Sequence, residues 1–418
     1  MENIMKKYVT RTNYLSKIRE FREQDLIKVV TGIRRCGKSV LMEQFQEELK
    51  SGGIKNNQII SINFEELENE ELLDYKKLHD YIRKRLNKNG WTYVFLDEIQ
   101  MVKDFQKTIS SLRAKKNVDI YITGSNSYLL SGELATLLSG RYILIHLLPL
   151  SFKEYCEAFE FNSAENKNNF PSRSQSMDVR QIFNNYLKFG SFPQTLKFKS
   201  QRAIYSYLDS IYNTVVVKDI CGREKTVDVG ILASIAKFIF HNIGNLVSAT
   251  TIADTLTSNK RKTSYNTVEK YLGLLKDSFI IYELSRYDVK GKQHLKQNAK
   301  YYSVDIGLRN MLLANKETDI GHVLENLIYL ELLRREYKVS VGKFDNKEID
   351  FVAENENGIE YYQVAASVLD KNTLERELES LNKIQDHFPK YIITLDEHTP
   401  NTSYNGIKII NAIDFLMG

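Results

Sequence analysis

The sequence predicts an α/β protein in which a parallel sheet is followed by a helical region and a second, smaller α/β unit. Two patterns carry this prediction. Short apolar runs alternate with helix-length segments up to residue 147, and strand-length runs return after residue 338. With 418 residues, the chain is long enough for several domains. We expect these domains to span residues 1–160, 161–225, 226–315 and 316–418.

The composition is that of an ordinary globular protein, with 42% apolar and 27% charged residues. No apolar run is long enough to cross a membrane, and none follows residues 1–7, so we expect a cytoplasmic protein without a membrane span. Cys36, Cys156 and Cys221 are scattered, which fits a reducing compartment and excludes a disulfide framework. The net charge of +5 permits nucleic-acid binding without arguing for it.

Residues 27–45 contain the most informative motif of the chain. A β-branched strand at 27–30 leads into G-x-x-x-x-G-K-S at 32–39, and an amphipathic helix follows. The glycines allow a tight turn whose N–H groups face an anion at a positive helix terminus. Lys38 is then placed to reach phosphates, and the Ser39 hydroxyl to hold Mg²⁺. We expect a phosphate-binding loop whose nucleotide contacts come from Gly32, Ile33, Arg34, Arg35, Cys36, Gly37, Lys38, Ser39 and Val40.

Three side chains inside this loop have open roles. One of Arg34 and Arg35 is expected to contact nucleotide and the other an acidic neighbour, and the sequence does not assign them. Cys36 lies beside a helix N-terminus, where the pKa of a thiol can be lowered. The simpler interpretation is that Cys36 is a small residue that fits the loop.

The rest of the first sheet is expected from four further strands, at 58–64, 92–98, 118–126 and 139–147. Helices are expected at 13–21, 65–86 and 105–115. Strands that alternate with helices predict a doubly wound sheet. Its ligand crevice should lie at the carboxyl ends of the strands.

Asp97 and Glu98 end the strand at 92–98, and a carboxylate in such a place is costly unless something pairs it. Downstream of a phosphate loop, Asp97 is expected to hold Mg²⁺ through water beside Ser39. Glu98 is expected to polarise the water that attacks the γ-phosphate. The alternative is that both carboxylates simply face solvent.

Polar residues also end the strand at 118–126. Ser125 or Asn126 is placed to sense the attacking water or the γ-phosphate, whereas the alternative is a turn capped by small polar residues. Arg141 is a candidate for stabilising the phosphoryl charge, either in its own chain or from a neighbouring subunit of a homo-oligomer. A surface salt bridge is the other interpretation of Arg141.

The chain becomes mainly helical after an Asn- and Ser-rich linker at 163–178, with helices expected over 180–239 and a break at 189–193. Helices at 248–256 and 264–278, then strands at 279–284 and 301–304, predict a winged helix. A smaller α/β unit follows. Its helices are expected at 321–335 and 374–386, and its strands at 339–344, 348–353, 359–365 and 391–395.

Basic residues on the winged-helix segment make double-stranded DNA a candidate partner. The candidates for phosphate contact are Lys260, Arg261, Lys262, Lys270, Lys276, Lys290, Lys292, Lys296 and Lys300. Tyr265, Asn266 and Thr267 begin the helix that would read base edges. Winged helices also bind proteins, so a protein partner is the alternative.

Several of these motifs resemble the AAA-type P-loop ATPases of prokaryotes: residues 31–39, 95–100, 122–126 and 137–142. Residues 148–155, 189–193 and 218–220 are similar to the connecting region of that family. The resemblance covers nearly the whole chain. It implies an ATPase that uses ATP and Mg²⁺ and carries a C-terminal domain similar to restriction-endonuclease-like nucleases, of unassigned function.

The nuclease pattern that this resemblance suggests is incomplete. Glu325 and Asp350 match its first carboxylates, but Gln363 stands where a carboxylate belongs and Ala365 where a lysine belongs. Neither an amide nor a methyl group can ligate a metal and activate water in the same way. We therefore expect a degenerate domain without nuclease activity.

Two hypotheses of function result. The first is an ATP-hydrolysing switch or motor that acts on DNA through the C-terminal half. The second is a nucleotide-gated protein-interaction module without DNA contact.

Overall fold

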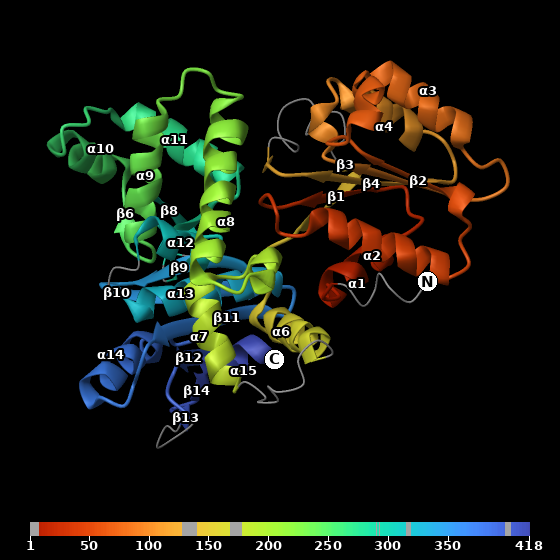
Figure 1. Ribbon diagram of the computed structural model, residues 1–418. Helices are drawn as coiled ribbons and strands as arrows, with labels where there is room; N and C mark the ends of the chain where they lie inside the picture. The colour runs from red at the N-terminus through yellow and green to blue at the C-terminus, as the bar shows by residue number, and fades with distance from the viewer. Residues whose placement is uncertain are drawn as a thin grey trace. The chain divides into compact units, whose positions relative to one another are not determined.

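Figure 1 shows a computed structural model of the chain, which describes residues 8–127, 140–167, 178–289, 291, 293–314, 319–397 and 403–418. The chain forms two compact units. The first comprises Met1–Pro149 with Asp277–Phe279, and the second Leu150–Lys276 with Ile280–Gly418. No helix among the described residues is both long and apolar enough to cross a membrane.

Unit 1 contains a five-stranded parallel sheet in the order β2-β3-β4-β1-β5. The strands are β1 Ile27–Thr31, β2 Ile59–Asn63, β3 Thr92–Asp97, β4 Val118–Gly124 and β5 Tyr142–His146. The predicted parallel α/β sheet is therefore confirmed. Because β4 lies between β1 and β3, the carboxyl end of β4 separates the loop after β1 from the acidic end of β3.

Helices cover both faces of this sheet, with α1 and α2 on one side and α3 and α4 on the other (Figure 1). Their bounds are α1 Thr12–Glu20, α2 Lys38–Ser51, α3 Tyr75–Arg85 and α4 Phe105–Arg113. On the α2 face, the rings of Phe45, Phe95 and Tyr121 pack together, and the centroids of the last two lie 4.6 Å apart. Leu78 and Ile109 are among the apolar side chains that α3 and α4 bury against the opposite face.

The helix expected over residues 65–86 is interrupted. A 3₁₀ helix at Leu67–Leu73 precedes α3, which begins after Asp74. The Asp74 carboxylate accepts hydrogen bonds from the backbone N–H groups of Lys76 and Lys77 at 2.9 and 3.0 Å. This N-cap has extended backbone angles, so a helix restarts at Asp74 instead of running through it.

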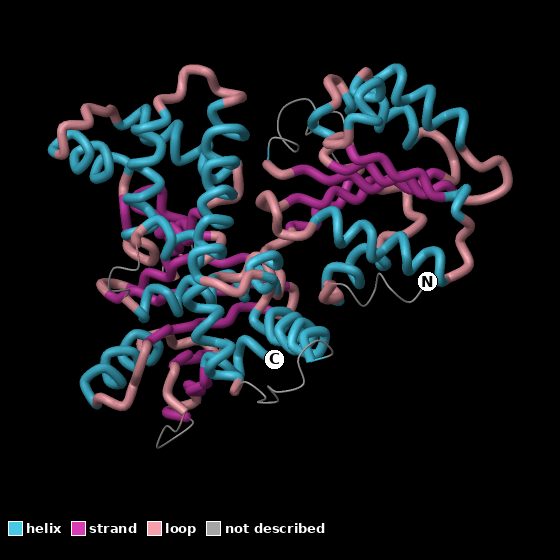
Figure 2. The backbone as a smooth tube through the Cα atoms, in the orientation of Figure 1, coloured by secondary structure: helices cyan, strands magenta, loops and turns pink. Residues whose placement is uncertain are grey.

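Unit 2 begins with helices, which Figure 2 draws in cyan. These are α6 Phe152–Lys167, α7 Val179–Phe189, α8 Gln201–Asn213, a π-helical stretch at Thr214–Cys221 and α9 Val229–His241. A 3₁₀ helix spans Pro193–Lys197, and α12 spans Ile306–Leu312. The linker expected at 163–178 is helical up to Lys167, and residues 168–177 of it lie outside the described residues.

The break between α7 and α8 has a specific cause. Gly190 has a φ of +76°, and a Cβ there would lie 2.2 Å from an Asp305 carboxylate oxygen. Asp305 also accepts a hydrogen bond from the Ser191 hydroxyl at 2.8 Å and caps α12 through the backbone N–H of Leu308 at 2.9 Å. Glycine is therefore needed where this buried carboxylate meets the backbone.

A nine-stranded mixed sheet forms the centre of unit 2, in the order β13-β14-β12-β11-β10-β9-β7-β8-β6. Its first three strands in the chain are β6 Leu246–Val247, β7 Ile281–Asp288 and β8 Gln293–Ser303. The helix pair α10 Ala249–Ser258 and α11 Tyr265–Asp277 lies between β6 and β7 in the chain. These elements follow the predicted order of helix, turn, helix and two-stranded ribbon.

The remaining strands continue this same sheet, because β7 pairs in parallel with β9. They are β9 Lys338–Phe344, β10 Lys347–Asn355, β11 Gly358–Ala365, β12 Lys390–Thr394, β13 Ser403–Tyr404 and β14 Ile407–Asn411. The segments predicted as separate domains at 226–315 and 316–418 therefore share one sheet. A local pattern reveals a strand but not its distant partner, so the sequence did not predict this pairing.

Helices α13 Ile320–Arg334 and α14 Lys371–Asn382 bury apolar side chains against the C-terminal strands, and α15 Ala412–Met417 ends the chain. Tyr329 of α13 stacks on Tyr302 of β8, with centroids 4.6 Å apart, and lies against Phe351 of β10. Leu381 of α14 belongs to a different apolar cluster, which includes Ile349 and Ile392. Among the described residues, the sheet thus packs against at least two separate apolar groups.

Candidate functional site

The predicted phosphate-binding loop connects β1 to α2 at the carboxyl edge of the unit 1 sheet. Gly32 has a φ of +151°, and a Cβ on it would lie 2.1 Å from the carbonyl oxygen of Leu147. Gly37 has a φ of +109° and caps α2 without a side chain, which leaves the first N–H groups of the helix open to a ligand. Both glycines of the motif are therefore required by the backbone.

Lys38 begins α2, and its side chain is only 4% exposed. Its ammonium group donates hydrogen bonds to the carbonyl oxygens of Gly32 and Ile33 at 3.0 and 3.3 Å. It also lies 3.5 Å from a carboxylate oxygen of Glu98. The loop and the end of β3, which are separate in the sequence, thus meet at one buried cation.

Asp97 and Glu98 lie at the carboxyl end of β3, and Thr123 of β4 connects them. The Thr123 hydroxyl donates to the Asp97 carboxylate and accepts the backbone N–H of Glu98 at 2.9 Å. Glu98 has a φ of +55°, the left-handed region that side chains rarely adopt. Neither carboxylate projects freely into solvent, in contrast to the alternative interpretation of this pair.

The pKa values of these two carboxyl groups are shifted in opposite directions. Burial raises the pKa of Asp97, against hydrogen bonds from Ser39 and Thr123 that favour its charged form. Burial also acts to raise the pKa of Glu98, but the Lys38 ammonium and the hydrogen bond from Gln100, together with weaker contributions, hold that pKa below its ordinary value. Glu98 is therefore a charged acceptor at neutral pH, and Asp97 lies beside the Ser39 hydroxyl.

The end of β4 places Ser125 and Asn126 between the loop and the β3 carboxylates. Asn126 is 1% exposed, and neither its amide nitrogen nor its carbonyl oxygen has a partner among the described residues. A buried amide with no hydrogen bond is costly. A bound phosphate or water at this point of the crevice would satisfy it.

The other residues of the loop differ in environment. Arg34 donates a hydrogen bond to Glu65 at 2.8 Å, whereas Arg35 is exposed with a φ of +66°. Ile33 and Cys36 are fully buried, so they shape the loop from within. Burial raises the pKa of the Cys36 thiol, so the suggestion of a lowered pKa is wrong.

Arg141 lies away from the loop of its own chain. The register pairs Tyr142 with Ile27 and His146 with Thr31, so Arg141 precedes the amino end of β5. The phosphate-binding loop follows the opposite end of β1, roughly 15 Å along the strands. This register argues against a role for Arg141 at the loop of its own chain, and a role from a neighbouring subunit stays a prediction.

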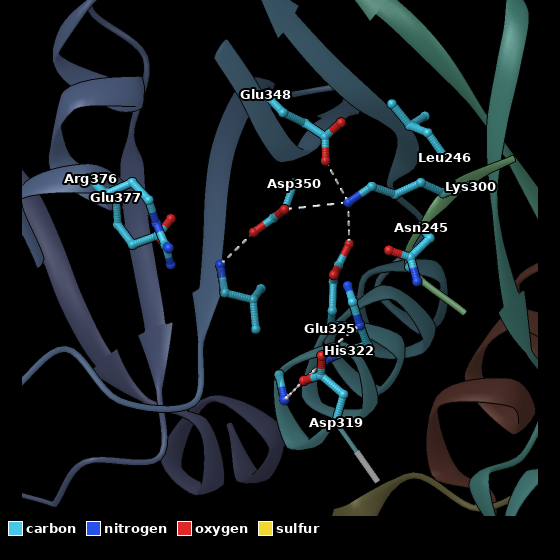
Figure 3. A pocket seen from close by; sticks show the side chains of 13 residues that line it. Asn245, Leu246, Lys300, Asp319, His322, Glu325, Glu348, Asp350, Arg376 and Glu377 are labelled. Atoms are coloured by element: carbon cyan, nitrogen blue, oxygen red, sulfur yellow. Dashed lines mark hydrogen bonds and ion pairs between the residues drawn. The ribbon is translucent and has the colours of Figure 1, made fainter. Parts of the chain in front are cut away.

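Unit 2 contains a separate pocket of about 400 Å³, shown in Figure 3. Its lining includes the carboxylates Asp319, Glu325, Glu348, Asp350 and Glu377 and the cations Lys300 and Arg376. The buried Lys300 ammonium lies among three of the carboxylates, 2.6 Å from Glu325, 2.8 Å from Glu348 and 3.5 Å from Asp350. Acidic groups outnumber the basic ones in this pocket.

This arrangement corrects two expectations. Lys300 is 3% exposed, so it does not line a DNA-facing ribbon. A lysine is also present among the nuclease-like carboxylates, although Ala365 supplies none. Gln363 accepts the backbone N–H of Asp350 at 2.7 Å and donates to Glu377 at 2.8 Å, which brings a further carboxylate to the pocket. The spacing of Gln363 and Ala365 along β11 could not reveal Lys300 or Glu377, because these two residues come from β8 and α14.

The candidate DNA surface is narrower than the list of lysines suggested. Lys260, Arg261 and Lys262 are exposed in the turn before α11, and Tyr265 at the start of α11 is 53% exposed. By contrast, Lys270 is paired with Glu224, and Lys276 with Glu283. The remaining candidates are Lys290 and Lys292, which lie outside the described residues, and Lys296, whose side chain does too.

The residues of the unit 1 site fit Mg²⁺ and the phosphates of a nucleotide, the ligands that the glycine-loop motif at residues 32–39 implies. A glycine-capped helix N-terminus and Lys38 suit phosphates, Ser39 and Asp97 are oxygen donors of the kind that Mg²⁺ prefers, and the amide of Asn126 lacks a partner. Together with the parallel sheet, these features define a domain of the P-loop nucleotide-binding class.

Comparison with known proteins narrows this class to the AAA domains. An AAA domain family matches residues 24–156, and a domain of unknown function (DUF8612) matches residues 180–319. The chain is 40% identical over 413 residues to an uncharacterized protein of Haemophilus influenzae, covering 99% of each chain. The uncharacterized protein MJ1544 of Methanocaldococcus jannaschii is 29% identical over 364 residues, which cover 85% of this chain and 78% of that one.

A similar solved structure is the Walker-type ATPase PABY2304 of Pyrococcus abyssi, with a TM-score of 0.52 and 17% identity, covering 74% of this chain and 97% of that one. This likeness concerns the fold alone. The chain belongs to the same family as the Haemophilus influenzae protein and carries an AAA domain of the P-loop ATPase type.

Proposed function

We propose that this protein binds and hydrolyses Mg·ATP in unit 1 and uses the nucleotide cycle as a switch for the helix-turn-helix region of unit 2. The observation that carries the proposal is the convergence of Lys38, Asp97, Glu98 and Asn126 at one edge of the sheet. The AAA domain matched at residues 24–156 supports it.

Each group has a distinct role in the proposal. Loop N–H groups and Lys38 would bind the phosphates, and Ser39 and Asp97 are the residues that would hold Mg²⁺. Mg²⁺ supplies charge neutralisation of the phosphates when bound. Glu98, kept charged by its neighbours, orients and polarises the attacking water. Asn126 donates to that water or to the γ-phosphate, and Ser125 is the adjacent alternative.

Lys38→Ala is expected to abolish tight Mg·ATP binding. The substitution removes a cation aimed at the phosphates, and a charge-assisted hydrogen bond contributes about 1.5–3 kcal/mol, so affinity should fall at least about 10- to 100-fold. Calorimetric titration with a slowly hydrolysed ATP analogue measures the loss. Wild-type affinity in this variant would refute the phosphate assignment.

Two measurements test the target of the switch. ATP hydrolysis is measured with and without double-stranded DNA, and DNA binding is measured at several salt concentrations. Lys38→Ala is the blank for hydrolysis. The exposed turn at Lys260–Lys262 and Tyr265 favour DNA as the target. Binding that weakens steeply with salt supports it, since phosphate contacts release counterions. Salt-independent hydrolysis without DNA binding would favour the alternative, a nucleotide-gated protein-interaction module.

No cleavage of single- or double-stranded DNA is expected with Mg²⁺ or Mn²⁺. A nuclease of this type would need a metal ion bound among these carboxylates. The Lys300 ammonium occupies that position, because it already pairs with Glu325, Glu348 and Asp350. Incubation of labelled DNA with purified protein checks this. Metal-dependent cleavage that disappears in Asp350→Ala would overturn it, and would assign the nuclease lysine to Lys300.

A further inference from the structure

Arg11 lies directly behind the phosphate-binding loop, although no nucleotide-binding motif contains it. Its side chain is 3% exposed, deep within unit 1. One guanidinium nitrogen donates to the carbonyl oxygen of Cys36 at 3.2 Å, and the other donates to that of Leu148 at 2.8 Å. Arg11 therefore bridges the loop to the segment that follows β5.

Further contacts hold Arg11 itself and the segment at Leu148 in place. The backbone N–H of Arg11 donates to Gln44 of α2 at 3.3 Å, and the guanidinium lies over the Tyr14 ring, 4.9 Å from its centroid. The Tyr14 hydroxyl accepts the backbone N–H of Leu148 at 3.3 Å. A flexible side chain held at so many points has little freedom to follow a moving loop, so it imposes a position on the loop.

The contact with Cys36 determines the direction of an amide group. In a planar trans peptide, the C=O and the following N–H point in opposite directions. The described peptide bonds are all trans, so a Cys36 carbonyl turned toward Arg11 directs the N–H of Gly37 away from it. In a glycine loop that precedes a helix, the N–H groups of the loop and of the first helical turn face a bound anion, so we expect the N–H of Gly37 to belong to that set.

We propose that Arg11 is a positioning residue of the ATP site, which aims the amide groups of the loop at the phosphates by holding the Cys36 carbonyl from behind. This inference rests on the proposed function. It makes residues 9–14 part of the binding machinery, since they carry Arg11 and the Tyr14 ring that supports it.

The role predicts a split between binding and turnover. Arg11→Ala should weaken Mg·ATP binding about 10- to 100-fold, the size of one charge-assisted hydrogen bond or slightly more. The kcat at saturating ATP should stay within about threefold of wild type, because Glu98 and Asp97 are held by Thr123 of β4. Arg11→Lys keeps the charge but not the forked guanidinium that reaches two carbonyls. Its affinity for Mg·ATP should therefore lie between those of wild type and Arg11→Ala.

The experiment measures the Kd for Mg·ATP, kcat and the melting temperature in wild type, Arg11→Ala, Arg11→Lys and Lys38→Ala. Arg19→Ala is the matched control. Arg19 lies on α1 and pairs at the surface with Glu48, so wild-type binding is expected there. The fluorescence of Trp91, the single tryptophan, reports whether unit 1 is folded in each variant.

Wild-type affinity in both Arg11 variants would overturn the proposal. So would a lower melting temperature of Arg11→Lys without weaker binding, since that result indicates a purely structural residue. If wild type binds Mg·ATP no better than Lys38→Ala, the proposed ATPase function itself fails. The Lys38→Ala arm thus separates the two failures.

Discussion

Replacing Glu98 by Gln is expected to leave Mg·ATP bound and to lower its turnover at least about 100-fold, the usual contribution of a general base. Glutamine keeps the size of the side chain and can still accept a hydrogen bond from its neighbour Gln100. It loses the negative charge that polarises water. Steady-state phosphate release and equilibrium binding of the same preparation measure the two quantities separately.

Glu48→Gln provides the control for Glu98→Gln. Glu48 lies on α2 in the same unit and pairs at the surface with Arg19, so its substitution should change neither binding nor turnover. Undiminished turnover in Glu98→Gln would mean that Glu98 only neutralises the buried Lys38 ammonium. In that case the variant should bind ATP differently while hydrolysing it normally.

Replacing Lys300 by Met is expected to destabilise unit 2 by roughly 3–5 kcal/mol, the range for breaking a buried ion pair. The substitution leaves Glu325, Glu348 and Asp350 together without the ammonium that lies between them. Trp91 belongs to unit 1, so its fluorescence should keep the wild-type urea midpoint while the circular dichroism of the whole chain shows an earlier transition.

The matched control for Lys300→Met is Lys347→Met, which removes an exposed ion pair with Glu379 at 2.9 Å. A surface pair of this kind contributes at most about 1 kcal/mol. Equal urea midpoints for the two variants would show that the buried cluster contributes nothing beyond a surface contact.

The loss of folding stability in Lys300→Met should also depend on pH. Burial, with repulsion by Asp350, raises the pKa of Glu325 to about 8, against the attraction of Lys300 and the hydrogen bond from Tyr302. A raised carboxyl pKa in the folded state means that stability falls as pH rises from the ordinary carboxyl range to about 8. Without Lys300 the pKa of Glu325 rises further, so the loss of stability should be larger near pH 8 than near pH 5.

The elements of unit 1 could be predicted because their patterns are local. The strand, glycine loop and helix over residues 27–45 are contiguous, and each part is specified by neighbours a few residues away. The same holds for the acidic end of β3 and the polar end of β4. In unit 2, by contrast, the sequence indicated the helix pair and most strands, but not the parallel pairing of β7 with β9 that joins them in one sheet.

The sequence by itself determined the chemistry that we propose for the nucleotide site: which groups are candidates to bind phosphate and which carboxylates follow them. The tertiary structure alone decided which distant residues complete or leave a site. It brought Arg11 behind the loop, buried Lys300 among carboxylates rather than on a DNA-facing ribbon, and placed Arg141 at the end of the strands opposite the loop. A local motif records a chemistry that one turn or strand can present. Contacts between segments far apart in the chain depend on sheet order and register, which no short pattern encodes.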